Sequence, residues 1–95
     1  MPAYLIADVN IQDKERYEAY KREVPAIIAR HGGEYLVRGG EHEVIEGKWH
    51  PTRLVLFRFP NRAAIHAFFA DPAYKPLAAL RHEIAESNLV AVDGI

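Results

Sequence analysis

Two hydrophobic periods alternate along this chain, and their order is what most limits the folds open to it. Alternation of period two, which is typical of β-strands, occurs near both ends and in the middle of the sequence. Apolar residues at helical spacing fill the two stretches in between. The resulting order, β-α-β-β-α-β, leaves few compact topologies for one small domain.

The sequence clearly predicts a first strand followed by a helix. Ala3–Ile11 has one wholly apolar face and one mixed face that carries Asp8 and Asn10. Asp13 is placed to cap the next helix, and Pro25 interrupts that helix, where we expect a kink because the apolar stripe continues in phase. The stripe consists of Tyr17, Tyr20, Val24, Ile27, Ile28 and His31.

The middle of the chain predicts two strands joined by a hairpin. Glu34–Arg38 begins the second strand, and we expect it to continue through a bulge at Gly39-Gly40 and on to Glu46. Glu46-Gly47-Lys48 has the composition of a hairpin turn. Arg53–Phe59 is then the third strand.

The second helical region divides into two segments. Asn61 caps the first segment, and Asp71 with Pro72 is expected to cap and begin the second, which extends to Ile84. The last strand covers Ser87–Val92. The apolar stripe of the first segment consists of Ala64, Ile65, Phe68 and Phe69.

This order predicts a single α+β domain over residues 1–95 with a ferredoxin-like fold, a four-stranded antiparallel sheet with helices on one face. The first and third strands are apolar on both sides, although helices cover only one side of such a sheet. An apolar content of 49% is at the high end for so short a chain. We therefore expect a homodimer in which two sheets meet face to face as an α/β barrel.

Composition excludes several classes of function. A net charge of −1 provides no basic surface for nucleic acid. The chain has no cysteine, so it has no thiolate metal site, and we expect neither a metal nor another cofactor. No apolar run has the length of a membrane span and the N-terminus does not resemble a signal peptide, so we expect a cytoplasmic protein.

Short motifs along nearly the whole chain carry a family resemblance. They are Tyr4-Leu5-Ile6, Tyr20, the stretch from Gly33 to Gly40 that ends in Val37-Arg38-Gly39-Gly40, Glu46-Gly47 before Trp49, Pro51-Thr52-Arg53-Leu54-Val55, Phe59-Pro60, Phe68 to Leu77 with its Tyr74, Arg81 and Val92-Asp93-Gly94. In these residues the chain resembles the family catalogued as domain of unknown function 1330, within the dimeric α/β-barrel superfamily. The resemblance implies a dimer with a cavity between sheet and helices. That superfamily includes cofactor-free monooxygenases, lactone isomerases and stress-response proteins.

Histidine and arginine are the candidate polar site residues. No two of the five histidines have metal-ligand spacing. His50 could act as a general base, or it is a solvated hairpin residue. Arg38, Arg53 and Arg81 could bind carboxylate or enolate oxygens through their planar guanidinium groups. The alternative is that they form structural ion pairs that orient the dimer, with Asp8, Glu34, Glu46 or Glu83 as partners.

The aromatic residues also allow a functional and a structural interpretation. Trp49, Phe68, Phe69 and Tyr74 could line a pocket for a flat organic ligand, or they could be part of the core. Tyr17 and Tyr20 are expected to belong to the core or to a dimer surface.

Two hypotheses of function follow. The first is a small-molecule-binding or stress-related module, which we favour because no residue pair has nucleophile–base spacing. The second is a cofactor-independent enzyme, monooxygenase- or isomerase-like, for a small anionic or aromatic metabolite. In the enzyme, Arg38 and Arg81 would hold the anion, His50 or Tyr74 would move a proton, and Trp49 with Phe68 would enclose the ring. The enzyme requires an open pocket, whereas a cavity filled by Phe and Leu side chains would argue against it.

Overall fold

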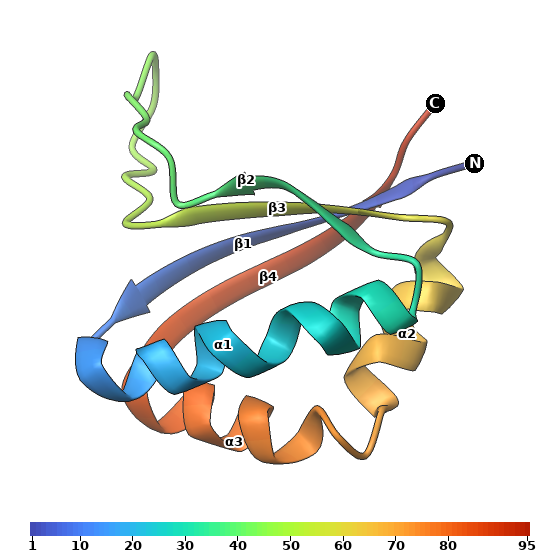
Figure 1. Ribbon diagram of the computed structural model, residues 1–95. Helices are drawn as coiled ribbons and strands as arrows, with labels where there is room; N and C mark the ends of the chain where they lie inside the picture. Colours follow the sequence, from blue (N-terminus) through green and yellow to red (C-terminus); the bar gives the residue numbers. More distant parts are fainter.

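Four strands and three helices make up the fold in the computed structural model, which describes all residues 1–95 (Figure 1). In chain order they are β1 (Ala3–Ile11), α1 (Lys14–Arg30), β2 (Glu34–Arg38), β3 (Leu54–Phe59), α2 (Arg62–Ala70), α3 (Lys75–Ile84) and β4 (Ala85–Asp93).

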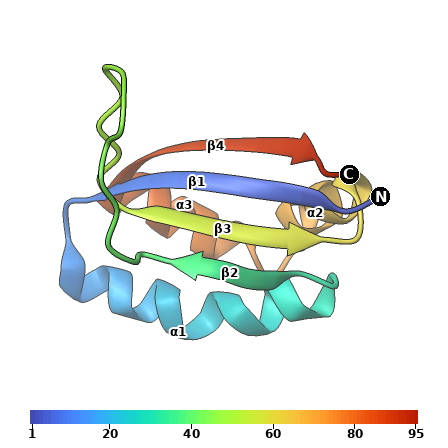
Figure 2. The same cartoon turned by 90° about the horizontal axis from the view of Figure 1, so that it is seen from above.

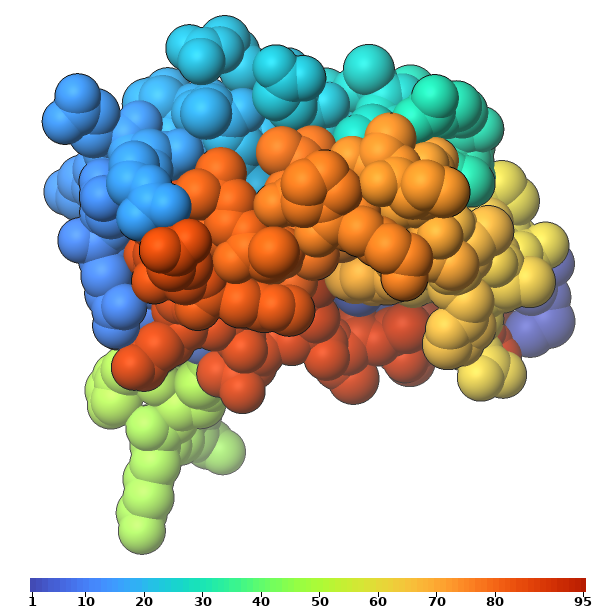
Figure 3. All heavy atoms as spheres, turned by 90° about the horizontal axis from the view of Figure 1, so that it is seen from below, coloured from blue at the N-terminus to red at the C-terminus, as the bar shows by residue number.

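The strands form one antiparallel sheet in the order β2-β3-β1-β4. All three helices lie on one face of this sheet, and the other face carries no helix (Figures 1 and 2). Seen from the helix side, α1 and α3 cover the sheet side by side (Figure 3). The predicted α+β, ferredoxin-like fold is therefore confirmed. No helix combines the length and the apolar character that crossing a membrane requires.

The core lies between the sheet and the helices. Leu5, Ala7 and Val9 of β1 are buried on this side, and the alternate residues of the strand are more exposed. The predicted stripe of α1 packs against them, because every apolar member of it is buried. Burial of one face of each element is the main contribution to the stability of so small a domain.

The predicted start of α1 is confirmed. The Asp13 carboxylate accepts a hydrogen bond from the Arg16 backbone N–H at 3.1 Å. The helix continues through Pro25.

The start of α3 differs from the prediction. Asp71 and Pro72 lie in the turn after α2, and the proline in the first turn of α3 is Pro76. The Asp71 side chain closes this turn by accepting a hydrogen bond from the Ala73 backbone N–H at 2.9 Å. Since this turn occupies residues 71 to 74, α3 begins only at Lys75.

The predicted second strand is too long. β2 ends at Arg38, because Gly39 has a φ of +73° that turns the chain away from the sheet, and the register irregularity lies earlier, between Tyr35 and Val37. Residues 39–53 form no strand, and we call this segment the arm. The arm stands out from the sheet on the side opposite the helices (Figure 1). It has no neighbouring strand, so its backbone cannot form the ladder that an extended conformation needs.

The sheet face without helices is largely apolar. Side chains opposite one another on antiparallel strands share a face, so Val90 and Leu56 flank Ile6 there, and Val92 lies beside Tyr4. Val90 is 58% exposed and Val92 is 48% exposed. By the same register Asp8, Arg58 and Asn88 lie on this face, so its apolar surface is interrupted by polar residues, as the mixed face of the first strand predicted.

Candidate functional site: a cationic pocket between the sheet and the helices

A narrow pocket lies between the sheet and α1, and its cavity volume is about 30 Å³. Of its 18 lining residues, 14 are hydrophobic. The other four are all cationic: Lys21, Arg38, Arg53 and Arg81. No Asp or Glu lines the pocket, and of its four cations only Lys21 has an acidic partner, Glu18 outside the pocket.

Arg81 is the buried cation of this site. It lies on the inner face of α3 with Ile84, and only 5% of its surface is exposed. Its Nε atom has no hydrogen-bond partner. Burial alone would lower the pKa of Arg81, but the hydroxyl oxygens of Tyr74 and Tyr20 more than offset burial and raise the pKa above its ordinary value. The guanidinium therefore stays charged although no carboxylate lies beside it.

Two tyrosine hydroxyls meet next to Arg81. The hydroxyls of Tyr20 on α1 and Tyr74 at the start of α3 are 2.8 Å apart, and both side chains are buried. Burial, together with the neighbouring Tyr74, raises the pKa of Tyr20 far above its ordinary value. Tyr20 therefore remains a neutral phenol that can donate a hydrogen bond.

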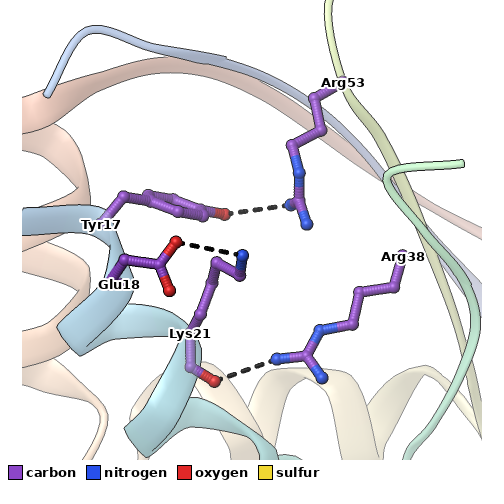
Figure 4. Close-up of polar contacts among 5 residues, drawn as sticks. All are labelled: Tyr17, Glu18, Lys21, Arg38 and Arg53. Carbon is purple, nitrogen blue, oxygen red and sulfur yellow. Dashed lines mark hydrogen bonds and ion pairs between the residues drawn. The ribbon is translucent and has the colours of Figure 1, made fainter. Parts of the chain in front are cut away.

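Arg38 and Arg53 reach across the mouth of the pocket to α1 (Figure 4). Arg53 Nη1 donates to the Tyr17 hydroxyl at 3.5 Å, and Arg38 Nη2 donates to the Lys21 carbonyl oxygen at 3.0 Å. The Arg38 guanidinium also lies 4.6 Å from the centre of the Tyr35 ring. Outside the mouth, four cations share the surface with one carboxylate, Glu18, whose Oε1 lies 3.3 Å from Lys21 Nζ.

Within the single chain the three arginines form no structural ion pair, and ion pairs that orient a dimer stay a prediction. Arg38, Arg53 and Arg81 form no ion pair within 4.0 Å, because three of the proposed acids have other partners and Glu46 has none. Glu83 pairs with Arg16, Glu34 pairs with Arg58, and Asp8 accepts hydrogen bonds from the arm.

The structure brings four of the six predicted site residues together. Those that line the pocket are Arg38, Phe68, Tyr74 and Arg81. Trp49 and His50 do not, because both lie exposed on the arm. Trp49 Nε1 donates to Asp8 Oδ2 at 3.1 Å, which holds the indole at the sheet face without helices. The enclosure of a ring by Trp49 and proton transfer by His50 would have to occur outside this pocket.

Three residues of the site were assigned no role from the sequence: Tyr17, Tyr20 and Lys21. The available signal was the pair of tyrosines in the buried stripe of α1, since a buried tyrosine hydroxyl normally has a polar partner. Its partner, Tyr74, is 54 positions away, so the pairing was not visible in the local pattern. No group of three or more His, Asp or Glu side chains is placed to hold a metal ion.

Solved structures with similar folds share little sequence with this chain. A protein of unknown function from Rhodopseudomonas palustris has a TM-score of 0.80 at 21% identity, over 99% of this chain and 82% of its own. SnoaB, a cofactor-independent oxygenase from Streptomyces nogalater, has a TM-score of 0.68 at 12% identity, over 99% and 93%. A dimeric ferredoxin-like protein of unknown function from Jannaschia has a TM-score of 0.66 at 11% identity, over 99% and 100%. At such identities these likenesses establish the fold alone.

A comparison with curated proteins found no match. The sequence profile described as Domain of unknown function (DUF1330) matches residues 2–95, nearly the whole chain. The resemblance found in the sequence motifs is thereby confirmed, and the chain belongs to the DUF1330 family.

Proposed function

We propose that this protein binds a small organic molecule with a largely apolar body in the pocket between the sheet and the helices. The observation that supports this is an open pocket walled by hydrophobic residues, with polar groups gathered at a few points. Ligand sites in proteins typically have this construction, although the free space here, about 30 Å³, is far smaller than an organic ligand needs. Binding would therefore require the aromatic and aliphatic side chains that line the pocket to move apart.

The experiment that tests binding is an NMR titration of the ¹⁵N-labelled protein with phenylacetate, phenylacetamide, hexanoate and hexanamide. Binding in the pocket would shift the amide signals of lining residues such as Val24, Phe57 and Leu89. Val24→Phe, which fills the pocket, should weaken binding at least tenfold, and Ala67→Leu on the exposed side of α2 should not. No shift at about 10 mM of any probe, well above a millimolar Kd, would contradict the proposal.

We also propose that the protein is a homodimer in which a second copy covers the helix-free face of the sheet. Support comes from the exposed valines of β4 and from the arm, where Ile45 is 85% exposed and Trp49 is 61% exposed. Apolar groups gathered on one side of a small domain commonly mark an interface. The Jannaschia protein of the same fold is described as dimeric. Light scattering should give twice the chain mass of 10.8 kDa, and a value near 10.8 kDa would refute the dimer.

A second candidate function is a cofactor-independent enzyme, and one observation favours it. Tyr20 and Tyr74 place neutral phenols beside the charged Arg81, so a proton donor and a cation for a developing oxyanion lie together. With His50 outside the pocket, a tyrosine would be the proton donor. The two functions separate when a bound probe is recovered and weighed by mass spectrometry. An unchanged mass after long incubation supports binding alone, and a changed mass supports the enzyme.

A further inference from the structure

We infer that the molecule bound in this pocket is a small carboxylate that enters head first, with its anionic group on Arg81 and its apolar body toward the mouth. This inference rests on the proposed binding function and specifies the class of ligand. Three observations carry it: the unpaired buried cation, an unused hydroxyl hydrogen beside it, and the different placement of the cations at the mouth.

Arg81 is a buried cation without a counter-charge. A guanidinium withdrawn from water loses hydration that a paired carboxylate normally replaces, and leaving it unpaired is costly. Its Nε–H has no acceptor, and the pocket that it lines contains no acid. The planar fork of a guanidinium matches the two oxygens of a carboxylate. A ligand carboxylate would therefore supply both the missing charge and the missing acceptor.

The tyrosine pair provides a second donor at the same place. Tyr20 and Tyr74 have two hydroxyl hydrogens between them, and the 2.8 Å bond that joins the two oxygens uses only one. Apart from that bond, neither hydroxyl donates to another acceptor in the protein. The remaining hydrogen is free to meet an oxygen of the ligand next to Arg81. Because burial raises the pKa of Tyr20, its phenol stays protonated and attracts rather than repels an anion.

The cations at the mouth are placed to attract the ligand, not to hold it. Arg38 is exposed and its guanidinium is engaged by the Lys21 carbonyl oxygen and the Tyr35 ring, and Arg53 is half-buried and donates to Tyr17 (Figure 4). Exposed charges of one sign near a pocket raise the rate at which opposite charges arrive and are screened by salt. The walls between mouth and interior are hydrophobic, which matches a short aromatic or aliphatic body once the side chains move apart to admit it.

The test compares matched probes on the wild-type protein. Phenylacetate should bind at least tenfold more tightly than phenylacetamide, which has the same shape without the charge, and hexanoate should exceed hexanamide in the same way. The side-chain ¹⁵Nε signal of Arg81 should shift with each acid and not with its amide. Equal affinities within each pair, with pocket signals shifted by both, would overturn the carboxylate inference and leave the proposed binding function intact. If no probe shifts any pocket signal, both proposals fail.

Substitutions of individual arginines test which of them binds the carboxylate of the ligand. Arg81→Met should remove the preference for acid over amide, and Arg81→Lys should retain part of it, because a charge remains without the fork. Arg38→Met should keep the preference and mainly reduce its dependence on salt. Arg62→Met, a matched control on α2 outside the pocket, should change neither. Loss of the preference in Arg38→Met but not in Arg81→Met would place the anion at the mouth and overturn the head-first orientation. If Arg81→Met does not fold, the ¹⁵Nε signal of the wild type decides the question.

Discussion

Arg81 occupies a position on α3 where helical spacing favours an apolar residue. Leu77, Arg81 and Ile84 follow the i, i+4, i+7 pattern of one helix face, and that face points into the core. A charged residue in such a stripe departs from the local pattern, and departures of this kind are expected at functional sites. The sequence placed Arg81 beside the stripe, and the structure places it in the stripe with two tyrosine hydroxyls as neighbours.

The hydroxyls of Tyr20 and Tyr74 should contribute to stability as a pair. Tyr20→Phe leaves the buried Tyr74 hydroxyl without its partner, so we expect a loss of about 1–2 kcal/mol in the free energy of unfolding. Tyr74→Phe should behave alike, and the double variant should lose less than the sum of the two. Urea denaturation of the four proteins measures this coupling. Additive losses would show that the two hydroxyls do not interact.

Gly33 is required for packing and not for its backbone conformation. A Cβ atom added there would lie 2.7 Å from Ile28 Cγ2 and 2.7 Å from the Phe59 ring, and both side chains are about 1% exposed. Since neither neighbour can move into solvent, Gly33→Ala should destabilise the protein by about 1–3 kcal/mol in urea denaturation.

Gly40 offers the matched control for that substitution, because no atom lies within 4 Å of an added Cβ there. Gly40→Ala should change the free energy of unfolding by less than about 0.5 kcal/mol. Similar losses in the two variants would mean that crowding is not what excludes a side chain at position 33.

At the scale of elements, periodicity predicted most boundaries well. The strand Ala3–Ile11 has the predicted bounds, and the predicted third strand begins one residue later than expected, at Leu54. Errors arose where an element depends on what lies beside it. β2 ends at Arg38 because the arm has no strand to pair with, and residues 71 to 74 form a turn because the Asp71 side chain bonds within it. The spacing of apolar residues along the sequence shows neither the missing partner strand nor the hydrogen bond within the turn.

Asp71 joins the end of α1 to the turn before α3, and this link should depend on pH. Its Oδ2 lies 2.8 Å from His31 Nε2 and 3.3 Å from Arg30 Nη2. The hydrogen bond with His31, then that with the Ala73 N–H and the charge of Arg30, lowers the pKa of Asp71. A lowered pKa in the folded state adds stability above the unfolded value of about 3.9, and that stability is lost as pH falls through the folded pKa.

Asp71→Asn should therefore be less stable than the wild type at pH 7, and the difference should close as pH falls below about 4. Thermal denaturation at a series of pH values measures it. Glu86→Gln, at an exposed residue of β4 without an ion pair, should show no difference at any pH. A constant difference for Asp71→Asn across the series would assign its effect to something other than charge.

At the scale of the whole molecule, the sheet has two different faces. One is covered by the helices (Figure 2), and the cationic pocket lies on that side. The other carries no helix and exposes the apolar side chains of Val90 and Val92. The pocket is thus formed within one chain, whereas the helix-free face is the one that the proposed dimer would cover. Ligand binding and self-association should accordingly respond to different substitutions.

Val90→Glu tests that separation. A carboxylate at position 90, on the edge strand β4 of the helix-free face, should convert the proposed dimer to a monomer, because burying an unpaired charge is costly. The scattering mass should fall to 10.8 kDa while the fold persists, since Val90 is exposed in the single chain. Ala79→Glu, on the exposed side of α3, is the control and should leave the mass unchanged. A dimer that survives Val90→Glu would need another interface.

The sequence by itself determined the order of the elements, the inner and outer face of each strand, the family and the surplus of apolar surface. These properties depend on the spacing of neighbouring residues, which the backbone converts directly into faces. Only the tertiary structure decided that α1 and α3 bring Tyr20, Tyr74 and Arg81 together, that these residues share a pocket without an acid, and that Trp49 and His50 lie outside it. Such contacts join residues far apart in the chain, and they follow from how helices dock on a sheet, which no local period records.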